Sequence, residues 1–450
     1  MASDRSRAGS RAVDRRRALR IGAAAVAASV AASPIPRLGS LFDPDGLFGP
    51  DDPPPAEPTS NAGTDPIETI HAAGVTGEGV RLGVADPTGF DPGRPELSSA
   101  TTALRGFGDD PVAVSGPTHG TAAAAAVARV APAADLALAR FSRPREFALA
   151  VEWFRDRGVD VLLVPVAAHG TASPERGPVA RALRDAEAAG TVVVAPTGNA
   201  ARGHWQRPVA PDSLREGRAI RGLQVRSPSG DDGPTGRLVA WVTHDGPPAL
   251  DLSLALVRRT DTGDGRNLIA LSTDAPTGTG ERLVARLDGG DYRLLVRPSG
   301  ESPEPGTLDT FRLEVTTPTH RLVPTTPTGS VASPASADTV LAVGAADGDG
   351  AAPYSGRGPT SDGGTGVDLV APPRPWSGPG KPGTSAAAAR AAGVAALVCD
   401  VLGGSEPRRV RELLETTASE AGRAGTDLGT GHGRLEPLRA VRRARARNGS

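Results

Sequence analysis

Short, uninterrupted apolar runs alternate with helix-like segments along the chain, and this alternation constrains the fold more than any other feature. The runs at residues 80–86, 159–167 and 191–196 are apolar at consecutive positions, as strands buried on both faces are. Residues 178–190, between the last two runs, have the pattern of an amphipathic helix that ends at a glycine. Since strands joined through helices run parallel, the sequence predicts an α/β fold with a mostly parallel sheet.

The pattern changes after about residue 205. From 205 to 322, short stretches of alternating apolar and polar residues replace the helical periodicity. The Asp-Gly-Gly-Asp at 288–291 lies between two such stretches, as a β-hairpin turn does. We therefore expect an antiparallel β-sandwich inserted into the α/β domain. The α/β character resumes at 339–347, and residues 407–422 predict a further amphipathic helix.

The N-terminus has the features of a twin-arginine export signal. Arg15, Arg16 and Arg17 precede a weakly hydrophobic, Ala-rich segment that is too short for a membrane span. A basic tail that runs into a short helix is the alternative. We expect an exported protein, extracellular or at the cell surface, in which no later segment is long and apolar enough to cross a bilayer.

These observations predict the organisation of the chain. The predicted parts are an export signal (1–34), a disordered linker rich in Pro, Asp and Gly (35–64), an α/β domain in two pieces (65–204 and 323–442), the inserted β-sandwich (205–322) and a basic tail (443–450).

Composition excludes several classes of protein. The 50 Lys and Arg residues nearly balance the 51 Asp and Glu residues, which gives no reason to expect a nucleic-acid partner. Cys399 is the only cysteine, so an intrachain disulfide and a Cys-based zinc site are both excluded. Its place in an apolar helix indicates an inert, buried thiol.

Ser385 stands at the start of an Ala-rich segment, residues 386–398, that has high helix propensity. Pro382 and Gly383 break any preceding element, which places the serine at the N-terminus of the helix. Unpaired backbone N–H groups and the positive end of the helix dipole meet there, so developing negative charge would be stabilised. An ordinary N-cap is the other interpretation, since Thr384 and Ser385 both suit that role.

Three further polar residues have similar positions at the edges of predicted elements. His119 precedes a second Ala-rich helix, Asp86 closes the strand at 80–86, and Asn199 follows the strand at 191–196. Active sites of open α/β sheets lie at the carboxyl ends of the strands. A nucleophilic serine needs a base, a carboxylate that orients the base and donors for the oxyanion, and these residues supply each type.

In the order Asp86, His119, Asn199 and Ser385, these residues resemble the catalytic positions of the subtilisin-like serine peptidases, the subtilases. VADPTGFD resembles the aspartate motif of the family, HGTAAAAAVA the histidine motif, VVVAPTGNA the oxyanion motif and GTSAAAARAAGVAAL the serine motif. The similarity covers roughly residues 65–204 and 325–440.

The resemblance implies a three-layer subtilisin-like fold and hydrolysis of peptide bonds. Ser385 would attack the carbonyl, His119 would take the serine proton, and Asp86 would orient the imidazole. The side-chain amide of Asn199 and the backbone N–H of Ser385 would bind the oxyanion. It also implies substrate-binding positions, which are Val166, Ala167, Ala168, Thr197 and Gly198.

Several residues depart from the family pattern. In the serine motif, Ala386 replaces the Met that follows the nucleophile in the family, and Ala389 and Arg390 replace the later Pro-His pair. In the histidine motif, Ala122 replaces the second histidine of the HGTH pattern. One residue more than usual, beginning with Pro87, precedes Gly-Phe-Asp. On the strand expected to pair with substrate, Pro165 cannot donate a backbone hydrogen bond, and Ala167 would narrow the pocket beside Gly198.

The expected function is that of an exported serine endopeptidase acting on proteins or peptides, with its oligomeric state left open. The chemistry requires no cofactor, although Asp91 and the acidic loops would allow structural calcium, as in many relatives; ordinary Asp-Gly turns are the alternative. The alternative function is a weak or inactive subtilase-fold protein that acts as a binding or adhesion scaffold through its β-sandwich.

Overall fold

The computed structural model describes residues 65–170, 177–210, 220–230, 233–246, 250–260, 265–274, 280–298, 310–379 and 382–448. All of them belong to one compact unit, residues 40–450. The predicted export signal at 1–34 and linker at 35–64 lie outside the described residues.

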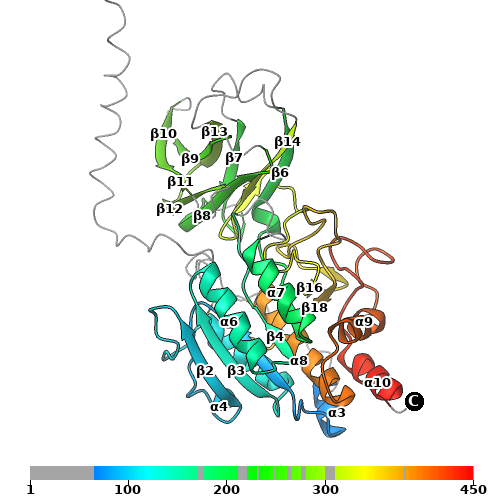
Figure 1. Cartoon of the computed structure of the whole chain (residues 1–450). Coiled ribbons are helices and arrows are strands. Elements are labelled where there is room, and N and C mark those ends of the chain that lie inside the picture. The colour runs from blue at the N-terminus through cyan, green and yellow to red at the C-terminus, as the bar shows by residue number, and fades with distance from the viewer. Residues whose placement is uncertain are drawn as a thin grey trace, which may run out of the picture. The chain divides into compact units, whose positions relative to one another are not determined.

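A mostly parallel sheet forms the centre of the α/β part (Figure 1). Its strands are β1 (Arg81–Ala85), β2 (Thr101–Phe107), β3 (Asp135–Phe141), β4 (Val161–Leu163), β5 (Val192–Pro196), β16 (Val340–Asp347), β17 (Gly350–Ala351) and β18 (Leu369–Ala371). Within the described residues, these eight strands follow the order β17-β16-β5-β4-β1-β3-β2, with β18 beside β16. Neighbouring strands pair in parallel, apart from β16 with β17. The predicted α/β class is confirmed.

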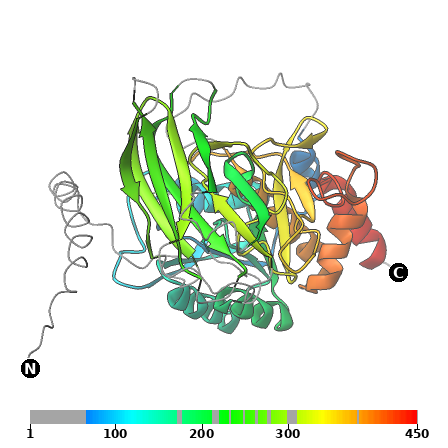
Figure 2. The ribbon, with the colours of Figure 1, turned by 90° about the horizontal axis from the view of Figure 1, so that it is seen from above.

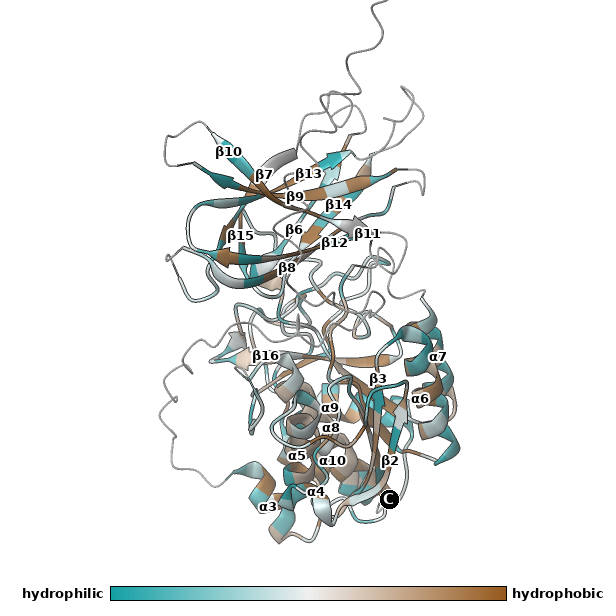
Figure 3. Cartoon of the chain, turned by 90° about the vertical axis from the view of Figure 1, so that its left-hand side faces the viewer, coloured by the Kyte–Doolittle hydropathy of each residue, from teal (hydrophilic) through white to brown (hydrophobic). Residues whose placement is uncertain are grey.

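Helices cover both faces of this sheet. The first face carries α3 (Pro66–Ala72), α4 (Pro95–Ser98), α5 (His119–Val130), α8 (Thr384–Leu402), α9 (Pro407–Thr417) and α10 (Pro437–Asn448). The second face carries α6 (Pro144–Asp156) and α7 (Pro178–Ala188). In Figure 3, α6 and α7 show teal residues among brown ones, as amphipathic helices with one buried face do. The predicted three-layer architecture is confirmed.

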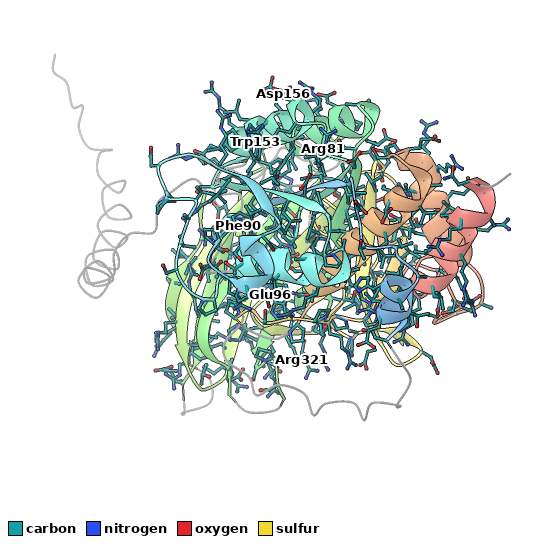
Figure 4. All side chains as sticks on the ribbon, turned by 90° about the horizontal axis from the view of Figure 1, so that it is seen from below. Arg81, Phe90, Glu96, Trp153, Asp156 and Arg321 are labelled. Atoms are coloured by element: carbon teal, nitrogen blue, oxygen red, sulfur yellow. The ribbon has the colours of Figure 1, made fainter. Side chains whose placement is uncertain are left out.

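The layers can be followed through the labelled residues of Figure 4. Trp153 and Asp156 on α6 lie to one side of Arg81 at the start of β1, and Glu96 on α4 lies to the other. Trp153 belongs to the apolar core of the second face, whereas Leu97, next to Glu96, belongs to that of the first.

Small residues allow α5 and α8 to pack closely in the core of the first face. A Cβ built on Gly393 of α8 would lie 2.5 Å from Cβ of Val130 on α5, a distance that no side chain tolerates. The alanines of both helices are almost all buried. Two helices that begin with His119 and Thr384 are thereby held against each other.

The helix α8 corrects one expectation from the sequence. Among the described helices it is long and apolar enough to cross a membrane by length and composition, although we expected no such segment after the N-terminus. In the fold, 78% of its apolar window is buried, as in the core helix of a compact domain.

The inserted segment forms two antiparallel sheets with a shared apolar core, as predicted. Its strands are β6 (His204–Val209), β7 (Ile220–Arg226), β8 (Thr235–His244), β9 (Leu252–Arg259), β10 (Arg266–Leu271), β11 (Thr273–Asp274), β12 (Gly280–Asp288), β13 (Tyr292–Pro298), β14 (Phe311–Thr316) and β15 (Arg321–Val323). In the part of the insert that the structure describes, the two orders are β10-β9-β13-β7-β15 and β11-β12-β8-β14-β6. Figure 2 shows these strands from above, in colours that run from green to yellow.

The chain enters and leaves the insert at neighbouring points. The short 3-10 helix η2 (Ala201–Gly203) precedes β6, and the backbone N–H groups of Thr317 and Thr326 donate to the carbonyls of Gly203 (2.8 Å) and His204 (2.7 Å). A β-sandwich can therefore be inserted here without separating the two pieces of the α/β part.

The predicted hairpin at 288–291 is wrong. Its two flanking strands belong to different sheets, because β12 pairs with β8 whereas β13 pairs with β9 and β7. Gly289 and Gly290 adopt positive φ angles of 91° and 109°, so the segment does turn sharply. The turn carries the chain from one sheet of the sandwich to the other.

Three predicted segment boundaries are also corrected. The strand expected over 159–167 ends at Leu163, because Pro165 has no N–H group to continue the ladder. The helix expected over 407–422 ends at Thr417. The basic tail expected from 443 is instead the last part of α10, in which Ala444 is fully buried and the Arg445 side chain donates to the Ala73 carbonyl at 2.7 Å.

Candidate active site

Asp86 and His119 form a buried pair at the end of β1. The Nδ1 atom of His119 lies 2.6 Å from Oδ2 of Asp86, whose carboxylate is fully buried. Because an ionised carboxylate only accepts hydrogen bonds, Nδ1 is the protonated nitrogen and Nε2 is left as the basic one. The pair therefore has the arrangement of a general base oriented by a carboxylate.

Thr88 holds the Asp86 carboxylate from the other side. Its backbone N–H and its hydroxyl both donate to Oδ1 of Asp86, at 2.9 and 2.6 Å. The same hydroxyl accepts a bond of 2.9 Å from the backbone N–H of Gly120, in the first turn of α5. A Cβ on Gly120 would lie 2.6 Å from the Gly89 carbonyl oxygen, so glycine allows this close approach. The sequence analysis missed Thr88, although a threonine two residues after an aspartate is typical of such a turn.

Ser385 occupies the first turn of α8, as predicted from its local sequence. Its Oγ donates to the carbonyl oxygen of Pro165 at 2.8 Å. The residue is half-buried, and its backbone N–H is among the first N–H groups of the helix, which have no acceptor within the helix. The hydroxyl thus meets the chain just after β4.

Asn199 is fixed through its side-chain oxygen. Its Oδ1 accepts from the backbone N–H of Thr384 at 3.0 Å and from the Thr384 hydroxyl at 2.9 Å. This pairing assigns the amide orientation and leaves the Nδ2 group as the donor of the side chain. A Cβ on Gly383 would lie 2.7 Å from Nδ2, so glycine is required before the helix. The sequence analysis did not assign this anchoring role to Thr384.

The three strand ends bring these groups to one edge of the sheet. Asp86 follows β1, Pro165 follows β4 and Asn199 follows β5, and β1-β4-β5 are neighbours in the sheet. Parallel strands end at the same edge of a sheet, so Asp86, Pro165 and Asn199 lie along one edge. His119 and Ser385 stand at the N-termini of α5 and α8, two helices that pack against each other.

A tyrosine side chain also holds the turn before the nucleophile. The Tyr354 hydroxyl donates to the Pro382 carbonyl oxygen at 3.2 Å. Burial raises the pKa of Tyr354 to about 12, with a further contribution from the negative charge of Asp347. The phenol is therefore protonated and a hydrogen-bond donor near neutral pH.

The ring of Trp376 packs against the ring of His119. The two ring centroids lie 5.2 Å apart at an angle of 59°. A Cβ on Gly378 would lie 2.4 Å from Cβ of Ala122, so the small residue at 122 makes room for this segment. The departure from HGTH noted in the sequence is therefore accompanied by an aromatic residue from a distant loop.

The predicted substrate-binding residues lie on two segments beside Ser385 and Asn199. Val166 and Thr197 are buried, and Ala168 forms an antiparallel bridge with Ser333 through bonds of 2.7 and 3.2 Å. Ala167 and Gly198 face each other across the gap between the segments.

Asp91, at which the sequence would allow structural calcium, has both carboxylate oxygens hydrogen-bonded to the backbone. Its two carboxylate oxygens accept from the backbone N–H groups of Gly93 (3.0 Å) and Gly116 (3.1 Å), so the side chain closes a loop. Across the described ranges, no group of three or more His, Cys, Asp or Glu side chains is placed to hold a metal ion. Cys399 is buried in α8, and burial raises the pKa of its thiol well above the usual range.

The chain is similar to known proteases in one segment of its sequence and in its fold. The family model described as the subtilase family matches residues 323–433. The fold is similar to that of the CspB protease of Clostridium perfringens, with 16% sequence identity, coverage of 84% of this chain and 97% of that chain, and a TM-score of 0.56. A protease of Pseudoalteromonas arctica gives 16% identity, coverage of 86% and 96%, and a TM-score of 0.47. No curated protein sequence matches the chain.

Proposed function

We propose that this chain, which has a subtilisin-like fold and a segment that matches the subtilase family, is an exported serine endopeptidase that hydrolyses peptide bonds. The observation that carries the proposal is the buried 2.6 Å contact between Asp86 and His119, with Asn199 after the nearby strand β5 and Ser385 hydrogen-bonded to Pro165 just after β4. Its substrates would be proteins or peptides. The Arg15–Arg17 cluster before an apolar segment supports export.

In the proposed reaction, the Ser385 hydroxyl leaves the Pro165 carbonyl and gives its proton to Nε2 of His119 as Oγ attacks the peptide carbonyl carbon. The imidazolium that forms is stabilised by Asp86. The oxyanion is bound by Nδ2 of Asn199 and by the backbone N–H of Ser385. His119 then gives the proton to the leaving amine, and water hydrolyses the acyl group by the same steps in reverse order.

The test of this function is covalent labelling of the full chain with a fluorophosphonate probe. An active enzyme should be labelled at Ser385, with the adduct located by mass spectrometry of the digested protein. Denatured protein is the control, because labelling must require the folded site. An unlabelled, folded chain would instead support the scaffold alternative, in which the β-sandwich is the working part.

Removal of the proposed oxyanion donor is expected to reduce kcat without abolishing hydrolysis. Asn199→Ala is expected to lower kcat by about a hundredfold to a thousandfold with little change in KM, the loss known for the equivalent asparagine of subtilisin. Steady-state kinetics on one peptide substrate measure it.

The matched control is Asn267→Ala, at an exposed position of β10. It should leave kcat unchanged. If Asn199→Ala retains full kcat, the assignment of its amide to the oxyanion is wrong.

A further inference from the structure

The position of Ser385 between two backbone segments dictates where a substrate side chain must go. The segment from Pro165 to Ala168 passes one side of the nucleophile, since Pro165 accepts its hydroxyl. The segment Thr197–Asn199 passes the other side, since Asn199 holds Thr384. A peptide carbonyl held between Ser385 Oγ and the Asn199 amide therefore directs the side chain of its own residue into the gap between the segments.

This gap is filled by two methyl groups. A Cβ built on Gly198 would lie 3.2 Å from Cβ of Ala332 and 3.4 Å from Cβ of Ala167, and 3.9 Å from Cε1 of His169. Ala332 comes from the segment that follows the insert, and its side chain is 4% exposed. The sequence analysis noted the narrowing by Ala167 but did not find Ala332.

Backbone hydrogen bonds fix the closed gap. The N–H of Ala332 donates to the Thr197 carbonyl at 3.1 Å, and the adjacent Ser333 bridges to Ala168. Three segments are thus tied together by main-chain contacts. A change of side-chain rotamer cannot open the gap, because an alanine methyl has no rotamer to change.

The insert reaches the neighbourhood of Ala332. A cavity of about 40 Å³ beside Ala332 is lined by Ala168 and His169 from the α/β part and by Glu314 from β14 of the insert. The insert also contacts His169 directly, because the Trp241 ring of β8 packs against it with ring centroids 5.4 Å apart and ring planes at 40°. Desolvation lowers the pKa of His169 to about 4, so the imidazole is neutral near neutral pH.

We propose that this enzyme cleaves after small residues, glycine, alanine or serine, and that Ala167 and Ala332 determine this specificity. The inference rests on the proposed peptidase function and adds to it the class of substrate. Each methyl group takes space that a longer substrate side chain would need, and the backbone around it cannot yield without breaking hydrogen bonds.

The test is a series of otherwise identical internally quenched peptides with Ala, Leu, Phe or Arg at the residue that supplies the scissile carbonyl. We expect kcat/KM for Ala to exceed that for Phe by about tenfold or more. Ala332→Gly and, separately, Ala167→Gly should raise kcat/KM for Leu or Phe relative to Ala by about tenfold or more. The matched control is Ala189→Gly, at the exposed end of α7, which should keep the original preference.

The outcomes separate the two proposals. A chain that labels with the fluorophosphonate probe but cleaves after Phe, Leu or Arg as well as after Ala overturns the specificity proposal alone. A folded chain that neither labels nor cleaves any peptide overturns the peptidase function, and the specificity proposal with it. If one glycine variant does not fold, the other variant and the preference of the unmodified enzyme still test the specificity proposal.

Discussion

Replacement of Ser385 by alanine is expected to lower the rate of peptide hydrolysis by roughly a million-fold, the loss that subtilisin suffers when its nucleophile is removed. The reason is the loss of the attacking oxygen, without which no acyl intermediate can form. Alanine suits the first turn of α8, because the segment is already a run of alanines and alanine has the highest helix propensity. The variant should therefore fold as the unmodified chain does.

The measurement is kcat/KM on a peptide in which alanine supplies the scissile carbonyl, together with a thermal melt of each variant. Ser98→Ala is the control, because Ser98 is exposed at the end of α4. This substitution also removes a serine hydroxyl, but at a position far from Ser385 in the sequence. Hydrolysis that persists at the original rate in Ser385→Ala would show that another group performs the attack, and the proposed mechanism would be discarded.

Asp86→Asn is expected to have the second largest effect, a fall in kcat of about ten-thousandfold. The side-chain oxygen of asparagine can still accept from the N–H and hydroxyl of Thr88, so the turn after β1 should be kept. Its NH₂ group would face Nδ1 of His119 as a donor where the carboxylate was an acceptor. The imidazole would then carry its proton on Nε2, which could no longer take the proton of Ser385.

This loss is measured as kcat at saturating substrate, with Asp156→Asn as the control. Asp156 is an exposed carboxylate at the end of α6, so its neutralisation should leave kcat within twofold (about 0.4 kcal/mol). An Asp86→Asn variant with nearly full activity would mean that His119 does not depend on this carboxylate for its tautomer. The role of the buried pair would then be structural.

Much of the fold could be predicted from local patterns. The apolar runs before Asp86 and Asn199 are β1 and β5, and the Ala-rich segment after Ser385 is α8. Such patterns work because burial on one or both faces is a property of a short segment. The length of β4 was overestimated, because apolar residues continue past Leu163 after Pro165 has ended the pairing.

Some residues of the candidate site could be predicted from local patterns, and others could not. Asp86, His119, Asn199 and Ser385 could be named because each stands at the edge of a recognisable element and within a motif. Residues that act through contacts between distant segments were missed. Trp376 meets His119, and Ala332 meets Gly198, and no local pattern marks either residue.

The sequence by itself determined which chemical groups are available and at which ends of strands and helices they stand, because propensity, periodicity and capping act over a few residues. The tertiary structure decided which strand ends are neighbours, that the turn at 288–291 joins two sheets, and that the methyl groups of Ala167 and Ala332 close the gap beside the nucleophile. These features depend on the packing of segments that are not adjacent in the sequence. Their free energy comes from contacts that form only when the whole chain has folded.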